Sequence, residues 1–277
     1  MATIEETLYY AAQGGRVSEV SSFLRDHPGI NVNWTNDNRW TPLHFASFNG
    51  HVEILKLLLE SPNINVNVTN SDGSTPLSFG CFYGQVSVVE VLLKDPRVDA
   101  TQDDNYGCTP LCYAARYGRH TVIERLIASG RDLGDIKNKK GKWVEGEDYT
   151  ALEIAKQYKQ GTIVILLERF LANPAQIRQE LRVKLGVVDE LAAELFALIV
   201  FLCDDLLQLK PVLASTSTAA AADATRFFTI AKKLAMELQM VLSRRVTGSM
   251  KQNILLKDSE AAFKSLAWIL LLPSPPK

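Results

Sequence analysis

Residues 41–68 read TPLHFASFNGHVEILKLLLESPNINVNV, and the fold can be predicted from the way this segment recurs. Its opening triplet, Thr-Pro-Leu at positions 41–43, returns at 75–77 and at 109–111, each time 34 residues later. A glycine follows the triplet with the same spacing, at Gly50, Gly84 and Gly118. A fixed period of this length is typical of stacked structural repeats.

Each copy also carries the signals of two short helices. Thr41 is suited to cap a first helix, and Pro42 to occupy its first position, where a missing N–H costs nothing. Gly50 then permits a tight left-handed turn into a second helix, which is rich in leucine. The period therefore predicts a hairpin of antiparallel helices in every copy.

The segment closely resembles the ankyrin consensus, a hairpin turn and two antiparallel helices with a T-P-L-H-x-A signature and a period of about 33 residues. The resemblance implies an all-α ankyrin-repeat solenoid whose role is to bind other proteins. In the family pattern His44 bonds backbone across repeats. Ser78 and Cys112 replace it in the next two copies, so we expect weaker bonding there.

Weaker copies flank the three clear ones, which gives about five repeats over residues 4–172. Thr150 opens the last copy 41 residues after Thr109, so the hairpin before it carries an insertion. Lys159 stands where the other copies have glycine, and this predicts a frayed helix turn. The expected repeats are 4–34, 35–68, 69–101, 102–135 and 136–172.

The 34-residue spacing is lost in residues 174–277, which form a helical segment of unassigned family. Helices are expected at 175–185, at 187–210, after residue 222 and at 259–271, with a low-complexity linker at 211–222. We interpret the segment as a small helical C-terminal domain or as a cap over the end of the stack, since solenoids need caps. Insertion of its apolar helices into a membrane is a further alternative.

Residues 234–242 suggest another role for this segment. Leu234-Ala235-Met236-Glu237-Leu238, followed by Val241-Leu242, loosely resembles the start of F-box-like segments, although their usual proline is alanine here. Such segments end some ankyrin proteins and recruit ubiquitin-ligase subunits. The alternative function is therefore a substrate-recognition adaptor of a ubiquitin-ligase or other complex.

Composition excludes several classes of partner. The chain has 30 Lys and Arg against 31 Asp and Glu, a net charge of −1, which gives no general attraction to nucleic acid or to an anionic membrane. The start, MATIEETLYYAAQGG, lacks the basic and apolar regions of a secretory signal, and four cysteines are few for 277 residues. We expect a monomer in the cytoplasm or the nucleus.

Candidate catalytic and metal-binding residues are few. Cys108, Cys112 and His120 lack a fourth convergent ligand. Cys81 and Cys112 occupy positions where the repeat has alanine and the structural histidine, so we interpret them as small buried apolar residues. No nucleophile set and no phosphate-binding glycine loop is present, and we expect no enzyme activity, no metal and no cofactor.

The hairpin tips and the two residues before each repeat glycine are positions that the ankyrin framework leaves free, and they line its concave face. Aromatic residues and one arginine, the types that dominate interface hot spots, concentrate there. The predicted partner-binding residues are Trp40, Phe48, Phe82, Tyr83, Tyr106, Arg116, Tyr117 and Tyr158. We expect them to stack at one-repeat intervals as a ladder that binds a protein; the alternative is that the rings pack against the next repeat.

Four lysines, Lys137, Lys139, Lys140 and Lys142, lie in the inserted hairpin. A basic tip can contact an acidic partner or act as a nuclear-import signal, and it can also be a solvated loop without either role. The sequence leaves these readings open.

Overall fold

The computed structural model describes residues 2–142 and 148–188, together with positions 192, 195–199, 231, 239, 240, 242, 243 and 247. The chain divides into two compact units, Met1–Leu181 and Arg182–Lys277. The first unit contains the repeats.

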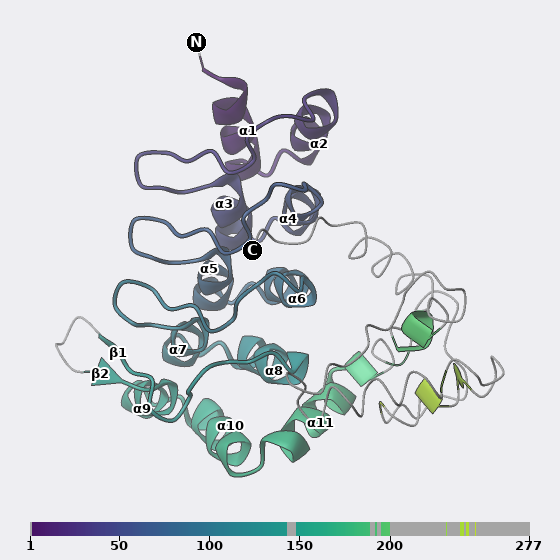
Figure 1. Cartoon of the computed structure of the whole chain (residues 1–277). Helices are drawn as coiled ribbons and strands as arrows, with labels where there is room; N and C mark the ends of the chain where they lie inside the picture. Colours follow the sequence, from purple (N-terminus) through teal and green to yellow (C-terminus); the bar gives the residue numbers. More distant parts are fainter. Residues whose placement is uncertain are drawn as a thin grey trace, which may run out of the picture. The chain divides into compact units, whose positions relative to one another are not determined.

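Pairs of antiparallel helices build this unit (Figure 1). The inner helices form one row: α1 (Ile4–Gln13), α3 (Pro42–Asn49), α5 (Pro76–Tyr83), α7 (Pro110–Arg116) and α9 (Ala151–Gln157). The outer helices form a second row: α2 (Val17–Asp26), α4 (Val52–Leu59), α6 (Val86–Lys94), α8 (His120–Ser129) and α10 (Gly161–Ala172). Long loops extend from the inner row on the side opposite the outer row (Figure 1). The prediction of an all-α ankyrin-type solenoid is confirmed.

The start of each inner helix is fixed as the sequence predicts. The side chains of Thr41, Thr75, Thr109 and Thr150 each accept a hydrogen bond from the backbone N–H three residues later. Proline follows the first three of these threonines at the first helical position. The cap satisfies an N–H that a helix start leaves without a partner, so the sequence alone determines where these helices begin.

The core lies between the two rows of helices. Small residues at one position of the inner helices let the rows approach closely; these are Ala46, Gly80, Ala114 and Ala155, all buried. At Gly80 an added Cβ would lie only 3.1 Å from the side chain of Val89. The outer helices contribute apolar side chains that are fully buried, among them Leu55, Leu92, Ile123 and Leu126.

Left-handed residues end the inner helices. Gly50, Gly84 and Gly118 have φ of 76°, 74° and 69°. Lys159 takes the same place with φ 56°, and the Gln160 N–H still donates to the Ala155 carbonyl at 2.9 Å, as in the other turns. The predicted frayed turn is therefore wrong, because the turn closes with a lysine in the left-handed conformation.

A steric difference explains why lysine is tolerated in the last repeat alone. A Cβ at Gly50, Gly84 or Gly118 would approach a side chain of the following repeat to 2.5 Å, 2.8 Å and 2.8 Å, respectively. Those side chains belong to Gln85, Arg119 and Gln160. In the described part of the chain no sixth helix pair of this kind follows α10, so Lys159 meets no such neighbour.

The loops of successive repeats are joined by backbone hydrogen bonds. Ser71 N–H donates to the Asn38 carbonyl, Asn105 N–H to the Asp72 carbonyl and Lys142 N–H to the Tyr106 carbonyl. The inserted hairpin contains a short antiparallel pair, β1 (Gly141–Lys142) and β2 (Asp148–Tyr149), with Gly141 opposite Tyr149. The insertion before repeat five is thus where the sequence placed it.

Helix α11 (Pro174–Lys184) begins beyond the last helix pair. Its residues Ile177 and Leu181 are buried, and the Arg178 side chain donates to the Ile127 carbonyl at the end of α8. This first part of the C-terminal segment therefore packs on the repeats. The predicted linker 211–222 and the helix at 259–271 lie outside the described residues, as does most of 187–210 and of 234–242. Among the described helices, none has the length and hydropathy to cross a bilayer.

Candidate functional site

A nearly continuous row of aromatic rings runs from repeat two to repeat five beside the ends of the inner helices. We call it the aromatic row, and it consists of Trp40, Phe45, Phe48, Phe79, Phe82, Tyr83, Arg116, Tyr117 and Tyr158. Neighbouring ring centroids within it lie 4.2–6.4 Å apart, a range in which aromatic pairs attract beyond their buried area.

The contacts between repeats follow one diagonal step. Phe48 contacts Tyr83 of the next repeat at 4.3 Å, and Phe82 contacts Tyr117 at 4.2 Å. The Arg116 guanidinium lies 4.9 Å from the Tyr158 ring centroid and so repeats the step with a cation in place of a ring. The sequence predicted columns of residues in register. The rings instead pair diagonally. The residue two positions before the left-handed turn residue of one repeat contacts the residue one position before the turn residue of the next repeat.

Exposure divides the row into two layers. Tyr83, Tyr117 and Tyr158 remain 37–38% exposed, whereas Phe48 and Phe82 are half-buried beneath them. The phenylalanines thus support the tyrosines, which keep a ring edge and a hydroxyl available to a partner. The rings therefore pack on the next repeat, as one interpretation of the sequence expected, and the tyrosines also face solvent; binding of a protein by these rings stays a prediction.

Trp40 and Tyr106 occupy different surroundings. Trp40 is half-buried, with its ring 4.4 Å from Phe79 and 4.7 Å from Phe45, so it belongs to the support of the row. Tyr106 is 54% exposed at the tip of a loop, and its ring contacts no other ring in the described part of the chain. The structure therefore brings seven of the eight predicted residues together and leaves Tyr106 apart.

Side chains of the following repeat fix the backbone under the row. Gln85 donates to the Phe48 carbonyl at 3.1 Å, Arg119 to the Phe82 carbonyl at 3.0 Å, and Gln160 to the Arg116 carbonyl at 3.5 Å. Each bond satisfies a carbonyl at the end of an inner helix. The backbone that carries the aromatic row is consequently held by its own repeat and by side chains of the following repeat.

Sequence reasoning missed Phe45 and Phe79, which bridge Trp40 and Phe48. The signal was available, because positions 45, 79 and 113 are all aromatic and share the 34-residue spacing. In the third copy Tyr113 contacts Phe82 and donates its hydroxyl to the buried Asp104. The consensus T-P-L-H-x-A leaves the position after the histidine open, so the signature itself does not single these residues out.

The lysines of the inserted hairpin do not act as one free basic cluster. Lys139 pairs with Asp103 at 2.6 Å and Lys140 lies 3.7 Å from the Glu153 carboxylate. The hydrogen bond and charge of Asp103 raise the pKa of Lys139. Lys137 and Lys142 are exposed. Lys139 thus joins the hairpin to the preceding repeat, and Lys140 joins it to its own repeat.

The buried cysteines and histidine have structural surroundings. Burial raises the pKa of the Cys81, Cys108 and Cys112 thiols, which keeps them protonated. The His44 ring accepts from the Thr41 N–H at Nδ1 and donates from Nε2 to the Ser74 carbonyl across the repeat boundary, at 3.1 Å each. Among the described residues, the Ser78 and Cys112 side chains bond to the threonine caps of their own helices and not across the repeat boundary, so the expected weakening is confirmed. Within the described residues no group of His, Cys, Asp and Glu is arranged to hold a metal ion.

Comparison with known proteins agrees with this architecture. A family profile described as ankyrin repeats (3 copies) matches residues 4–70 and residues 63–140. No curated protein matches the chain. Ankyrin repeats are in general protein–protein interaction modules, and proteins built from them are typically non-catalytic scaffolds. From its repeat pattern, its helix pairs and this match, the chain belongs to the ankyrin-repeat family.

Proposed function

We propose that the chain is a non-catalytic scaffold that binds a segment of another protein on the aromatic row. The observation that carries the proposal is the layer of partly exposed Tyr83, Tyr117 and Tyr158 above half-buried rings. Tyrosine buries a large area with few rotatable bonds, so little conformational entropy is lost on binding.

Preorganisation supports this role. The ring contacts between repeats and the bonds from Gln85, Arg119 and Gln160 hold the row in place before any partner arrives. Arg116, stacked against Tyr117 and Tyr158, adds a half-buried cation that suits a carboxylate or a backbone carbonyl. The proposed partner thus presents apolar side chains with an acceptor opposite Arg116, in the cytoplasm or nucleus.

Joint substitution of Tyr83, Arg116 and Tyr117 by alanine tests the proposal. A partner is first identified by affinity purification with the wild-type chain, and its affinity is then measured by calorimetry with purified components. We expect the triple variant to bind about 100-fold more weakly, or worse, because three central contacts of about 1 kcal/mol each sum to about 3 kcal/mol.

Tyr106→Ala is the matched control, since Tyr106 is an exposed tyrosine outside the row. It should bind as the wild type does, and all variants should keep the helical circular dichroism signal. Unchanged affinity in the triple variant refutes the aromatic row as the binding face.

The adaptor function is proposed on residues 234–242 alone. Deleting residues 211–277 should leave partner binding intact and abolish any interaction with a Skp1-type subunit. No binding of that subunit to the full chain at micromolar concentration removes the adaptor proposal.

A further inference from the structure

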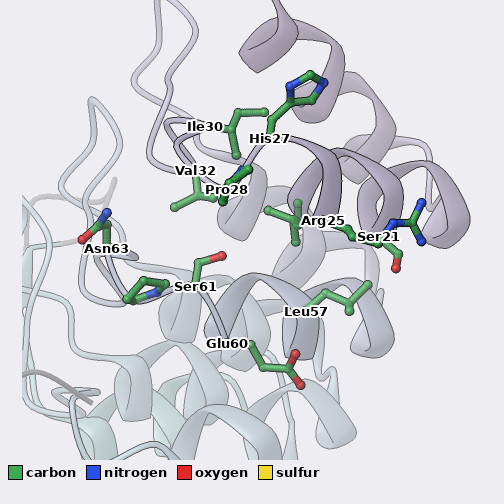
Figure 2. A pocket seen from close by; sticks show the side chains of 12 residues that line it. Ser21, Arg25, His27, Pro28, Ile30, Val32, Leu57, Glu60, Ser61 and Asn63 are labelled. Carbon is green, nitrogen blue, oxygen red and sulfur yellow. The ribbon is translucent and has the colours of Figure 1, made fainter. Parts of the chain in front are cut away.

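A cavity of about 430 Å³ opens between α2 and α4, on the outer helices of the first two repeats (Figure 2). Its apolar lining comes from Leu24, Pro28, Ile30 and Leu57; Glu60 lies at its lower edge and Asn63 at its left edge in Figure 2. It lies on the outer helices and their connecting loops, away from the ends of the inner helices that carry the aromatic row.

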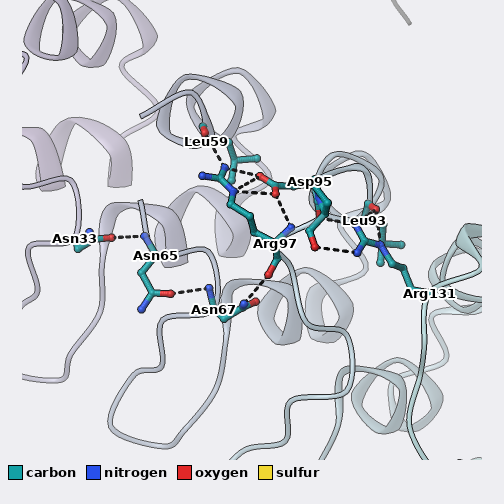
Figure 3. A network of polar contacts seen from close by, with 9 residues as sticks. Asn33, Leu59, Asn65, Asn67, Leu93, Asp95, Arg97 and Arg131 are labelled. Carbon is teal, nitrogen blue, oxygen red and sulfur yellow. Dashed lines mark hydrogen bonds and ion pairs between the residues drawn. The ribbon is translucent and has the colours of Figure 1, made fainter. Parts of the chain in front are cut away.

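The corresponding places between later repeats are filled by arginine. The eighth residue of each of the first four outer helices (Leu24, Leu59, Leu93 and Ile127) offers its carbonyl near the helix end. Arg97 donates to the Leu59 carbonyl at 2.9 Å, and Arg131 donates to the Leu93 carbonyl at 3.0 Å (Figure 3). Arg178 of α11 donates to the Ile127 carbonyl at 3.3 Å. The chain thus places a guanidinium at three of four equivalent helix ends.

The first helix end lacks this donor. Leu24 has Pro28 four residues later, which has no N–H, and the His27 N–H donates to Phe23 instead. Asn63 stands in the arginine position, 34 residues before Arg97, and its side chain is shorter. Among the described residues no hydrogen bond reaches the Leu24 carbonyl.

The chemistry of the cavity matches an arginine side chain. The negative end of the α2 dipole and the Glu60 carboxylate favour a cation. Leu24, Pro28, Ile30 and Leu57 provide an apolar wall for the methylene stem. Arg25, which also lines the cavity, has its charge paired with Asp26 at 3.0 Å and its guanidinium turned aside (Figure 2).

We propose that this cavity is a binding site for an arginine side chain of a partner protein. The incoming guanidinium takes the place that Arg97 and Arg131 occupy between later repeats, and donates to the Leu24 carbonyl. The chain therefore offers a partner a second contact, on the outer helices, that does not depend on the aromatic row.

The probe for this site is N-acetyl-arginine amide, with N-acetyl-citrulline amide as its uncharged counterpart of the same shape. Titrated into the ¹⁵N-labelled full chain, the arginine amide should shift backbone amide resonances of residues 21–32 and 57–63, with a Kd in the millimolar range. The citrulline amide should shift them at least about fivefold less at equal concentration, because the helix end favours a cation.

A double variant fills the site from within. Ser61→Asp with Asn63→Arg reproduces the pairing of Asp95 with Arg97, whose side chains lie 2.6 Å apart. It should lose the arginine-induced shifts and melt about 2 °C higher. Asn63→Gln puts a neutral side chain shorter than arginine at this position, so the arginine amide should still shift the resonances. Glu60→Gln should weaken binding of the arginine amide about threefold. Equal shifts by both amides, or arginine shifts that persist in the double variant and in Glu60→Gln, overturn the proposal.

Discussion

Replacing Gly84 by alanine lowers the free energy of unfolding by about 2–4 kcal/mol. The expected loss has two causes: an L-residue in the left-handed region costs about 1 kcal/mol or more, and crowding of a packed site costs about 1–3 kcal/mol. Gly84 has φ 74°, and its added Cβ would lie 2.8 Å from Arg119 Cδ. Arg119 must then move and give up its bond to the Phe82 carbonyl. Urea unfolding followed by circular dichroism measures the change.

Lys159 supplies the matched control, because it has the same backbone conformation and no following repeat contacts it in the described part of the chain. Lys159→Ala keeps an L-residue at φ 56° and should change stability by less than about 0.5 kcal/mol. If Gly84→Ala proves as mild as Lys159→Ala, contacts from the next repeat do not determine where glycine is needed.

Acidification destabilises the repeats through His44 by about 3 kcal/mol between pH 6.5 and pH 4. Burial lowers the pKa of His44 from 6.5 to about 4. Nδ1 accepts from the Thr41 N–H, so protonation there would also oppose two donors. Since the unfolded chain binds this proton more readily, the contribution is complete above pH 6.5 and is lost as the pH falls through 4.

The glutamine of the His44→Gln variant cannot titrate. When this variant is compared with the wild type, the pH-dependent contributions of all other titratable groups to the unfolding free energy cancel. The difference in unfolding free energy between the two proteins should shrink as the pH falls from 7 to 4. NMR titration of the His44 ring gives its pKa directly. A pH-independent difference, or a ring pKa near 6.5, contradicts the prediction.

The sequence determined the helix starts and most of the turns, because these depend on single residues in a repeated place. Thr41 and Gly50 act through the backbone of neighbouring residues, so their effects can be predicted from the sequence of a single repeat. Lys159 was misjudged because tolerance of a side chain there depends on the repeat that would follow. Whether such a repeat contacts this position is a property of the tertiary structure and not of the local sequence.

The candidate site was predictable in composition but not in geometry. Spacing alone identified Phe48, Phe82 and the tyrosines after them, yet it could not reveal that rings meet diagonally. Which rings meet depends on how successive helix pairs pack on one another, and no single residue encodes that packing. Tyr106 illustrates the same limit, since its place on a loop tip separates it from rings of similar register.

The bonds from His51, Gln85, Arg119 and Gln160 all run from a later repeat back to the one before it. During synthesis from the N-terminus, each repeat therefore leaves the ribosome with an unsatisfied helix end, and its successor completes it. Phe82 obtains its backbone partner only after Arg119 has emerged, and Arg116 only after Gln160. The aromatic row consequently acquires its backbone support in chain order, and a chain that stops before Gln160 lacks the bond to the Arg116 carbonyl.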